Sequence, residues 1–261
     1  MKEKQLQQKK RRILWGWILA VLLLSISMGT VNVQAAKLKL NKTKVTVYKG
    51  CTETLKVTGS KKKVKWSSSK KAVASVSSSG KIKGKKKGTT VIYAKVGKQT
   101  LKCKVTVKEP SNAQRLNLAK KEARKIVKKY VISNLNTKER AFVLFRYLTE
   151  HCSWQLNQST EAYKKNYGNE AYAALILKKA ACSGYARAYK LLCEAAGIPV
   201  RHVNAGSWTH QWNEIKANGK WIKVDAYGGT FADTTGIRKS LLKESKNKEQ
   251  LVFKFVMEEE E

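Results

Sequence analysis

The second half of the chain is organised around one stretch, residues 181–225, which reads ACSGYARAYKLLCEAAGIPVRHVNAGSWTHQWNEIKANGKWIKVD. Apolar residues recur at helical spacing from its second residue, Cys182, so the sequence predicts a helix that begins there. Gly197 is a suitable residue to end this helix, and Pro199 cannot continue it. A short strand is expected next, over 200–203.

Cys182 stands at a position that suits a nucleophile. At the start of a helix, the unpaired backbone N–H groups and the positive end of the helix dipole favour a thiolate over a thiol. The same N–H groups can donate to an oxyanion that develops during attack on a carbonyl. The competing interpretation is an inert buried thiol, which is the commoner role of a single cysteine.

The residues that follow supply two partners for such a thiol. An Asn-Gly dipeptide at 218–219 lies between two alternating runs and predicts a tight β-hairpin. Counting outward from this turn puts Trp212 opposite Asp225, and His210 becomes the diagonal neighbour of Asp225 on the same face. Diagonal neighbours are roughly 7–8 Å apart at Cα, within reach of a His–Asp hydrogen bond. We therefore predict Cys182 as nucleophile, His210 as base and Asp225 as the group that orients the base.

The same residues carry a family resemblance. Four blocks occur in order: a Cys-x-Gly-Tyr-Ala helix start, a Gly-Ile-Pro-x-Arg turn, a His-x-Trp strand and a Trp-x-x-x-Asp strand. The first two lie within LILKKAACSGYARAYKLLCEAAGIPVRHVNAG (175–206), and the last two lie within THQWNEIKANGKWIKVDA (209–226). Over about residues 136–227 the chain resembles the core of the transglutaminase-like superfamily. The resemblance implies an α+β, papain-like cysteine-enzyme domain, a cysteine acyltransferase or cysteine peptidase whose triad is Cys182, His210 and Asp225.

The chain departs from the family pattern in two places. The family often has Gly-Val before the nucleophile, whereas this chain has Ala180-Ala181, so we expect a narrower approach to the oxyanion site. Few residues follow Asp225, so the substrate-binding elements are expected to be reduced. The oxyanion is expected to accept a hydrogen bond from the Cys182 backbone, and Trp154 is a candidate for a second donor.

Residues 36–109 show a different pattern, in which apolar residues alternate with polar ones and turn signals separate the runs. This predicts an antiparallel β-sandwich. The region resembles the bacterial immunoglobulin-like group 2 domain through KVTVYKG (44–50), TLKVTG (54–59), VKWSSS (64–69), AVASVSSSGKIKGKKKGTTVIYA (72–94) and LKCKVTV (101–107). Lysines cluster at 61–63 and 85–87. The module is either a solvated spacer or a means of retention on anionic cell-wall polymers.

The boundary between the two regions is expected at Pro110, which cannot continue a central strand. Residues 110–135 are assigned to a linker and a Lys-rich lead-in helix, and residues 136–261 to the catalytic domain. A further helix is expected to begin at Asn136 or Thr137, with Glu139 placed for a capping box, and to end near residues 150–152.

The N-terminal residues 1–35 have the layout of a signal peptide, with basic residues at 9–12, an apolar run over 13–28 and a cleavage site after Ala35. The alternative is an uncleaved anchor, which would be the one link to a membrane. In both cases the rest of the chain lies outside the cytoplasm, where disulfides persist. Strand parity predicts that Cys51 and Cys103 both face the core, where they either form a disulfide or remain two buried thiols. If Cys152 and Cys193 also pair, Cys182 is the odd thiol among five cysteines, although sequence cannot give the connectivity.

The formal net charge is +36, from 54 Lys and Arg against 18 Asp and Glu, and it implies an anionic partner or environment. Export makes nucleic acid a poor choice of partner. No cofactor is expected, and three scattered histidines without a Cys-x-x-Cys motif give no metal site. His202 is interpreted as structural and His151 as a surface residue. The aromatic residues Trp212, Trp221 and Tyr227 are interpreted as packing around the triad.

Two functions follow from these observations. The first is a secreted or cell-surface thiol enzyme that forms a Cys182 thioester with a carboxamide or peptide carbonyl of a protein or peptide, and passes the acyl group to an amine or to water. The products would be a crosslink, a deamidated residue or a cleaved peptide. The second is a non-catalytic cell-wall-binding protein whose basic sandwich adheres to wall polymers.

Overall fold

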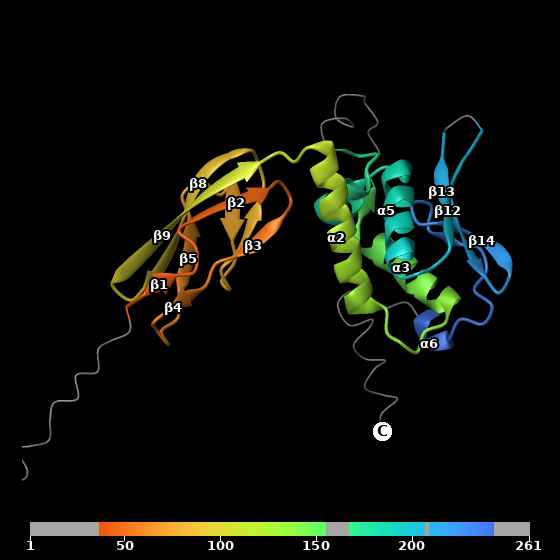
Figure 1. Cartoon of the computed structure of the whole chain (residues 1–261), viewed down its shortest axis with the longest axis horizontal. Helices are drawn as coiled ribbons and strands as arrows, with labels where there is room; N and C mark the ends of the chain where they lie inside the picture. The colour runs from red at the N-terminus through yellow and green to blue at the C-terminus, as the bar shows by residue number, and fades with distance from the viewer. Residues whose placement is uncertain (1–36, 155–166, 207–208, 243–261) are drawn as a thin grey trace, which may run out of the picture.

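The computed structural model describes residues 37–154, 167–206 and 209–242 of the 261-residue chain (Figure 1). The signal peptide predicted over 1–35 lies outside the described residues. Two domains lie side by side, a β-sandwich and an α+β domain, joined where strand β9 leads into helix α2. This is the expected fold class, in which alternation of apolar residues predicted the sandwich and the family resemblance implied the α+β domain.

The sandwich contains a four-stranded sheet and a three-stranded sheet. The four-stranded sheet has the order β2 (Lys44–Tyr48), β9 (Gln99–Lys108), β8 (Gly88–Val96), β5 (Lys65–Ser68). The three-stranded sheet has the order β3 (Thr52–Thr54), β7 (Lys81–Gly84), β6 (Ala74–Val76), and a short pair joins β1 (Lys39–Leu40) to β4 (Val57–Thr58). The apolar faces that alternation produces meet in one core, formed by Val47, Leu55, Ala74, Ile82, Ile92, Cys103, Val105 and Val107.

One prediction about the sandwich is wrong. Strand β2 runs parallel to β9, with Val45 opposite Val105 and Val47 opposite Val107, so the sheet is not wholly antiparallel. Alternation determines which face of a strand is buried, but it carries no information on the direction of the neighbouring strand.

Three helices and a sheet form the second domain. Helix α2 (Asn112–Tyr130), α3 (Thr137–His151) and α5 (Cys182–Ala195) share one core with a sheet of order β12 (Val200–Asn204), β13 (Gln211–Ala217), β14 (Lys220–Asp225), β15 (Thr230–Phe231). The smaller elements are the parallel pair β10 (Ser153–Trp154) and β11 (Lys179–Ala180), the π-helical turn Ala173–Leu177 and helix α6 (Lys239–Leu242). Asn136 caps α3, and Glu139 completes the predicted capping box.

Helix α2 packs in the core of this domain. Its residues Ala119, Ala123 and Ile126 are buried, and α2 lies against α5. Its N-terminal cap is Ser111, which forms a capping box with Gln114. The basic face of this Lys-rich helix is exposed to solvent.

Polar contacts join the two domains. Tyr172 donates its hydroxyl to the backbone carbonyl of Lys49, and Gln114 Nε2 donates to Tyr48 Oη over 2.7 Å. Gly50 has a positive φ of 81°, and a Cβ there would lie 2.5 Å from Leu177 Cδ2, so this turn of the sandwich lies directly against the second domain. The interface needs a residue without a side chain at this point.

The predicted disulfides are not present. All five cysteines are free thiols. Cys103 is fully buried in the sandwich core, whereas the Cys51 thiol hydrogen-bonds to Tyr172 of the second domain. The Cys193 thiol hydrogen-bonds to Tyr189 within α5, while the Cys152 thiol donates to the Ser153 carbonyl. Strand parity and the number of cysteines could not identify the groups that these thiols contact.

Candidate active site

Cys182 is the first residue of α5, as the sequence predicted. The preceding residue Ala181 is the N-cap, and its side chain makes no capping hydrogen bond. The first turn also contains no acidic residue. Cys182 is partly exposed, while most of the helix behind it is buried. The N-cap residue therefore offers no side chain to the backbone N–H groups of this turn, and the start of a helix suits the stabilisation of a negative charge at the sulfur or at a bound oxyanion.

A neighbouring loop fixes the start of α5. The N–H of Ala181 donates to the carbonyl of Gly168 over 3.0 Å. Gly184 lies against the same carbonyl, and a Cβ on Gly184 would also lie 2.8 Å from the Ala180 Cβ. Only glycine allows this approach, which gives the Cys-x-Gly spacing a physical reason.

Strand β10 runs along the residues that precede Cys182. It pairs with β11 in parallel, with Trp154 opposite Ala180. The Trp154 side chain is 57% exposed, and its ring lies 5.9 Å from the ring of Tyr227. Trp154 therefore lines the surface near the start of α5, where a substrate would approach.

The hairpin of β13 and β14 has the predicted register. Ala217 lies opposite Lys220 across a turn in which residues 218 and 219 both have positive φ, 50° and 77°. His210 directly precedes β13, and Asp225 is the last residue of β14. His210 Nε2 and Asp225 Oδ2 are 2.6 Å apart, so the diagonal contact that the register predicted is present.

Asp225 is 7% exposed, and both of its oxygens have partners. The backbone N–H of Gly228 donates to Oδ1 over 2.8 Å, while Oδ2 faces His210. An ionised carboxylate can only accept hydrogen bonds, so His210 Nε2 carries the proton in this pair and Nδ1 is left as the basic nitrogen.

Tyr227 connects the two parts of the site. Its ring lies 6.0 Å from the His210 ring and 5.5 Å from the ring of Tyr185, one turn after Cys182 in α5. Burial raises the pKa of the Tyr227 hydroxyl, and the negative charges of Cys182 and Asp225 act in the same direction. The side chain is thus within electrostatic range of both the thiol and the carboxylate.

The other histidines have structural contacts. His202 Nε2 is 2.9 Å from Gln211 Oε1, in agreement with its interpretation as structural. His151 is half-buried and has local partners, whereas the prediction placed it at the surface. It stacks on Tyr147 at 4.4 Å and its Nδ1 lies 3.0 Å from the Tyr147 carbonyl, because it occupies the last turn of α3, where one side faces the core.

The tryptophans of the hairpin have two roles. The ring of Trp212 stacks on the ring of His210, with their centres 6.1 Å apart. Lys223 Nζ lies over the Trp212 ring, 4.6 Å from its centre. Trp221 is 41% exposed and lies under Arg201, farther along the sheet. Trp212 therefore packs against the site, whereas Trp221 belongs to the outer surface.

The other four thiols are poor nucleophiles at neutral pH. Burial raises the pKa of Cys51 and of Cys103, and it raises the pKa of Cys152 to about 11. Burial also raises the pKa of Cys193, which lies against Tyr189 inside α5. A thiol must ionise to attack a carbonyl, so the raised pKa values make these four cysteines weaker nucleophiles than a free thiol.

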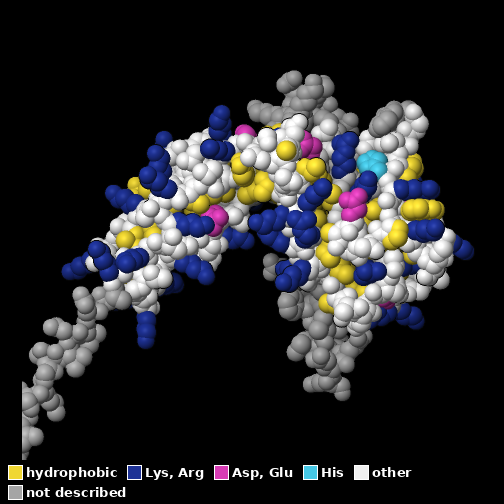
Figure 2. Space-filling model, in the orientation of Figure 1, with side chains coloured by type: hydrophobic (Ala, Val, Ile, Leu, Met, Phe, Trp, Pro, Cys, Tyr) yellow, Lys and Arg dark blue, Asp and Glu magenta, His cyan; other side chains and the backbone are white. Residues whose placement is uncertain are grey.

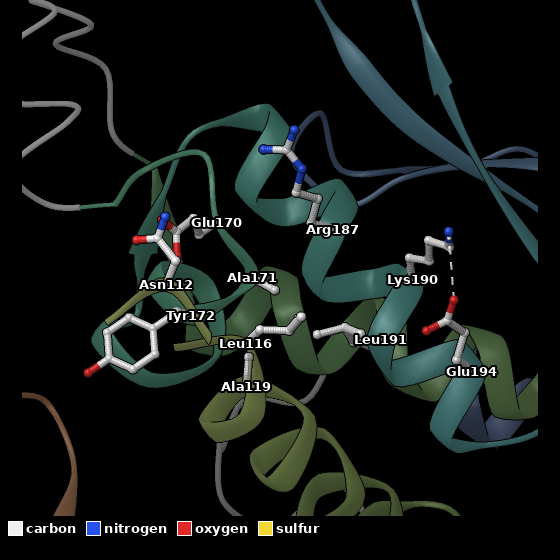
Figure 3. Close-up of a pocket in the computed structure, with 10 residues that line it drawn as sticks. All are labelled: Asn112, Leu116, Ala119, Glu170, Ala171, Tyr172, Arg187, Lys190, Leu191 and Glu194. Carbon is white, nitrogen blue, oxygen red and sulfur yellow. Dashed lines mark ion pairs between the residues drawn. The ribbon is translucent and has the colours of Figure 1, made fainter. Parts of the chain in front are cut away.

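Two pockets clarify where a substrate could bind. A pocket of about 210 Å³ lies beside the site and is lined by Thr149, Cys152, Ser153, Trp154, Ala226, Tyr227 and Gly229. A second pocket, of about 340 Å³, lies between α2 and α5 (Figure 3). Figure 3 shows an apolar centre formed by Leu116, Ala119, Ala171 and Leu191, with the Lys190–Glu194 ion pair at one side. No member of the predicted triad lines the second pocket.

Among the described residues, no group of three or more His, Cys, Asp or Glu side chains is arranged to hold a metal ion. In the same parts of the chain, no helix combines the length and the apolar character needed to cross a membrane.

Comparison with known families identifies both domains. Residues 124–226 match the transglutaminase-like superfamily, and residues 27–107 match the bacterial Ig-like domain (group 2). The chain therefore contains a transglutaminase-like domain preceded by a bacterial Ig-like domain. The match to the first family begins within α2, in agreement with the packing of that helix in the core of the second domain.

Several solved structures resemble parts of the chain. Domains 4 and 5 of the S-layer protein SbsC share 30% identity over 27% of this chain and 50% of that one, with a TM-score of 0.23. A protein from Cytophaga hutchinsonii assigned as a cysteine protease shares 22% identity over 45% of this chain and 39% of that one, with a TM-score of 0.33. A TGase shares 14% identity over 61% of this chain and 47% of that one, with a TM-score of 0.34.

The chain spans half of the SbsC fragment and less than half of the other two proteins. No curated protein matches the chain.

Proposed function

We propose that this protein is a thiol acyl-transfer enzyme in which Cys182 is the nucleophile, His210 the general base and Asp225 the residue that orients the base. The observation that carries the proposal is the 2.6 Å contact between His210 Nε2 and Asp225 Oδ2, and it is supported by a partly exposed cysteine at the first position of α5. The transglutaminase-like domain supports a cysteine enzyme of this class.

The first half of the reaction forms a thioester. His210 Nδ1 accepts the thiol proton of Cys182, and the sulfur attacks the carbonyl carbon of a carboxamide or a peptide bond. The oxyanion accepts hydrogen bonds from the first-turn N–H groups of α5. His210 then gives the proton to the departing nitrogen, so that ammonia or an amine leaves and the acyl group stays on sulfur.

The second half releases the acyl group. An amine or a water molecule loses a proton to His210 and attacks the thioester, and Cys182 leaves with that proton. Transfer to an amine gives a crosslink, whereas transfer to water gives deamidation or proteolysis. The substrate is a protein or peptide, and the pocket beside Trp154 and Tyr227 is the nearest apolar recess for its side chains.

The place of action follows from the N-terminal residues. We infer that basic residues 9–12 and the apolar run over 13–28 direct the chain out of the cytoplasm, so that the enzyme acts at the cell surface or in the surrounding medium.

The proposal can be tested with the full chain and a mixture of carboxamide-containing peptides. One arm includes a biotinylated primary amine and the other contains water as the sole acceptor, and mass spectrometry measures amine incorporation, deamidation and cleavage. Cys182→Ala and His210→Ala should both abolish every product. If the unsubstituted chain forms no more product than Cys182→Ala in either arm, the non-catalytic wall-binding function replaces the enzyme.

A further inference from the structure

The cleft between the two domains is strongly basic. It has a volume of about 580 Å³, and its lining contains Lys81, Lys83, Lys121, Lys125 and Lys178 against one carboxylate, Glu122. Figure 2 shows Lys and Arg side chains gathered on the concave side of the molecule, where the two domains face each other. The lysines of the lining come from both walls and from the base of this cleft.

The wall formed by the sandwich combines ammonium groups with hydroxyl groups. Lys81 and Lys83 point outward from β7, the middle strand of its sheet. Lys83 lies opposite Thr52 on one neighbouring strand and opposite Ser75 on the other. Directly opposite residues share a face of the sheet, so a hydroxyl group flanks Lys83 on each side.

The facing wall is helix α2. Lys121 and Lys125 are one turn apart and so lie on the same face of the helix. Lys125 pairs with Glu122 at 3.3 Å. Within the described parts of the chain, no carboxylate lies within 4.0 Å of Lys81, Lys83 or Lys121. Among the described residues, these three exposed ammonium groups form no ion pair, and Glu122 is the one carboxylate in the lining of the cleft.

The cations act on one another across the cleft. Lys178 Nζ donates to Tyr147 Oη over 2.7 Å at the base. Burial lowers the pKa of Lys178, the nearby Glu122 and Cys152 oppose this shift, and the charge of Lys83 on the opposite domain adds a smaller lowering. An anion between the two walls would relieve this repulsion.

We propose that this cleft binds a linear phosphodiester polymer that carries no bases. Ammonium and hydroxyl groups are common donors to phosphate oxygens, and lysines spread over two walls suit several successive phosphate groups rather than one shaped ligand. The lining contains no arginine that could hold a carboxylate through two parallel hydrogen bonds. It also contains no aromatic side chain, which recognition of single-stranded nucleic acid uses for stacking.

The proposed site is separate from the proposed catalytic residues, because none of them lines the cleft. It also differs from the lysine clusters at 61–63 and 85–87, which are absent from the cleft lining. Binding at this site would therefore hold the enzyme on an anionic polymer while Cys182 stays accessible.

The test compares two variants with the same loss of charge. The first carries Lys81→Gln, Lys83→Gln and Lys121→Gln in the cleft, and the second carries Lys61→Gln, Lys62→Gln and Lys63→Gln in an exposed loop of the sandwich. A short poly(glycerol phosphate) chain is the probe, and calorimetry measures its Kd at low and at moderate salt. We expect the cleft variant to weaken binding about tenfold or more and to reduce its salt dependence, and the loop variant to weaken it less than about twofold.

Three results would overturn the proposal. If both variants bind the polymer more weakly by the same factor, the net positive charge of the whole protein, and not the cleft, attracts the polymer. Competition by a deoxythymidine oligonucleotide with equal strength at equal phosphate concentration would contradict selectivity for a polymer without bases. Equal competition by inorganic phosphate would contradict binding of successive phosphates.

An unchanged thermal midpoint and unchanged alkylation of Cys182 show that each variant is folded.

Discussion

The backbone N–H of Gly228 donates to Asp225 Oδ1 over 2.8 Å, and the other carboxylate oxygen contacts His210. The carboxylate is thus held from two sides, by a turn of the chain and by the imidazole. A Cβ on Gly228 would lie 2.7 Å from Oδ2, so no larger residue fits without displacing the carboxylate. The orientation of the proposed base therefore depends on a glycine that takes no part in the chemistry.

We predict that Gly228→Ala lowers turnover by about 10- to 100-fold, because a small displacement of Asp225 changes the position of His210. The rate of acyl transfer, compared with the thermal midpoint of the same variant, measures this effect. Gly206→Ala is the matched control, because a Cβ there meets nothing within 4 Å. Equal loss of turnover in both variants, or full activity of Gly228→Ala, would contradict the role assigned to this turn.

We also predict that a single thiol reacts with iodoacetamide at neutral pH. The pKa of Cys152 is raised to about 11 by burial, so at pH 8 only about one part in a thousand of this thiol is ionised. The pKa values of Cys51, Cys103 and Cys193 are raised as well. Intact-mass analysis without reductant should find one fast label.

The Cys182→Ala variant should lose this label, and His210→Ala should slow it. Fast labelling of a second thiol, or retention of the label in Cys182→Ala, would show that another cysteine is the reactive one.

Part of this site could be predicted from the sequence, because short-range rules apply to it. The Asn-Gly turn determines the hairpin register, and the register brings His210 to Asp225. The second partner of Asp225 could not be predicted, because a backbone N–H has no sequence signature. The Gly228-Gly229 pair, which is separated from the end of β14 by two residues, is the one signal that a tight turn follows.

In the fold, too, features set by neighbouring residues could be predicted, whereas contacts between distant residues could not. Capping of α3 by Asn136 follows from neighbouring residues, and it was predicted. The parallel pairing of β2 with β9 and the contact of Cys51 with Tyr172 join residues that are far apart in the chain. Periodicity gives the buried face of an element but not the partner that covers it.

Tyr227 should act through its ring and not through its hydroxyl. The ring lies 6.0 Å from His210, 5.9 Å from Trp154 and 5.5 Å from Tyr185. Tyr227→Phe retains these contacts and should keep turnover within about twofold, whereas Tyr227→Ala removes them and should lower it about tenfold or more. Steady-state kinetics on one peptide substrate compares the two variants. If Phe is as damaging as Ala, the hydroxyl itself takes part in the reaction.

The last prediction concerns stability and its dependence on pH. Glu139 is 3% exposed, and Arg238 Nε donates to its Oε1 over 2.7 Å. Burial alone would raise the pKa of Glu139, but the hydrogen bonds from Arg238 and the Asn136 backbone outweigh it and hold the pKa below its usual value. A carboxylate whose pKa is lowered in the folded state stabilises the fold above its unfolded pKa, near 4.3, and this contribution is lost as the pH falls through the folded value.

Glu139→Gln should therefore lower the free energy of unfolding by about 1–3 kcal/mol at pH 7 and by less at pH 3, because Gln cannot pair with Arg238 as an anion. Urea unfolding at the two pH values measures the difference. Glu53→Gln is the control, since Glu53 pairs with Lys42 at the surface of the sandwich and should contribute less than about 1 kcal/mol. A loss for Glu139→Gln that is equal at both pH values would mean that its neutral hydrogen bonds, and not its charge, stabilise the start of α3.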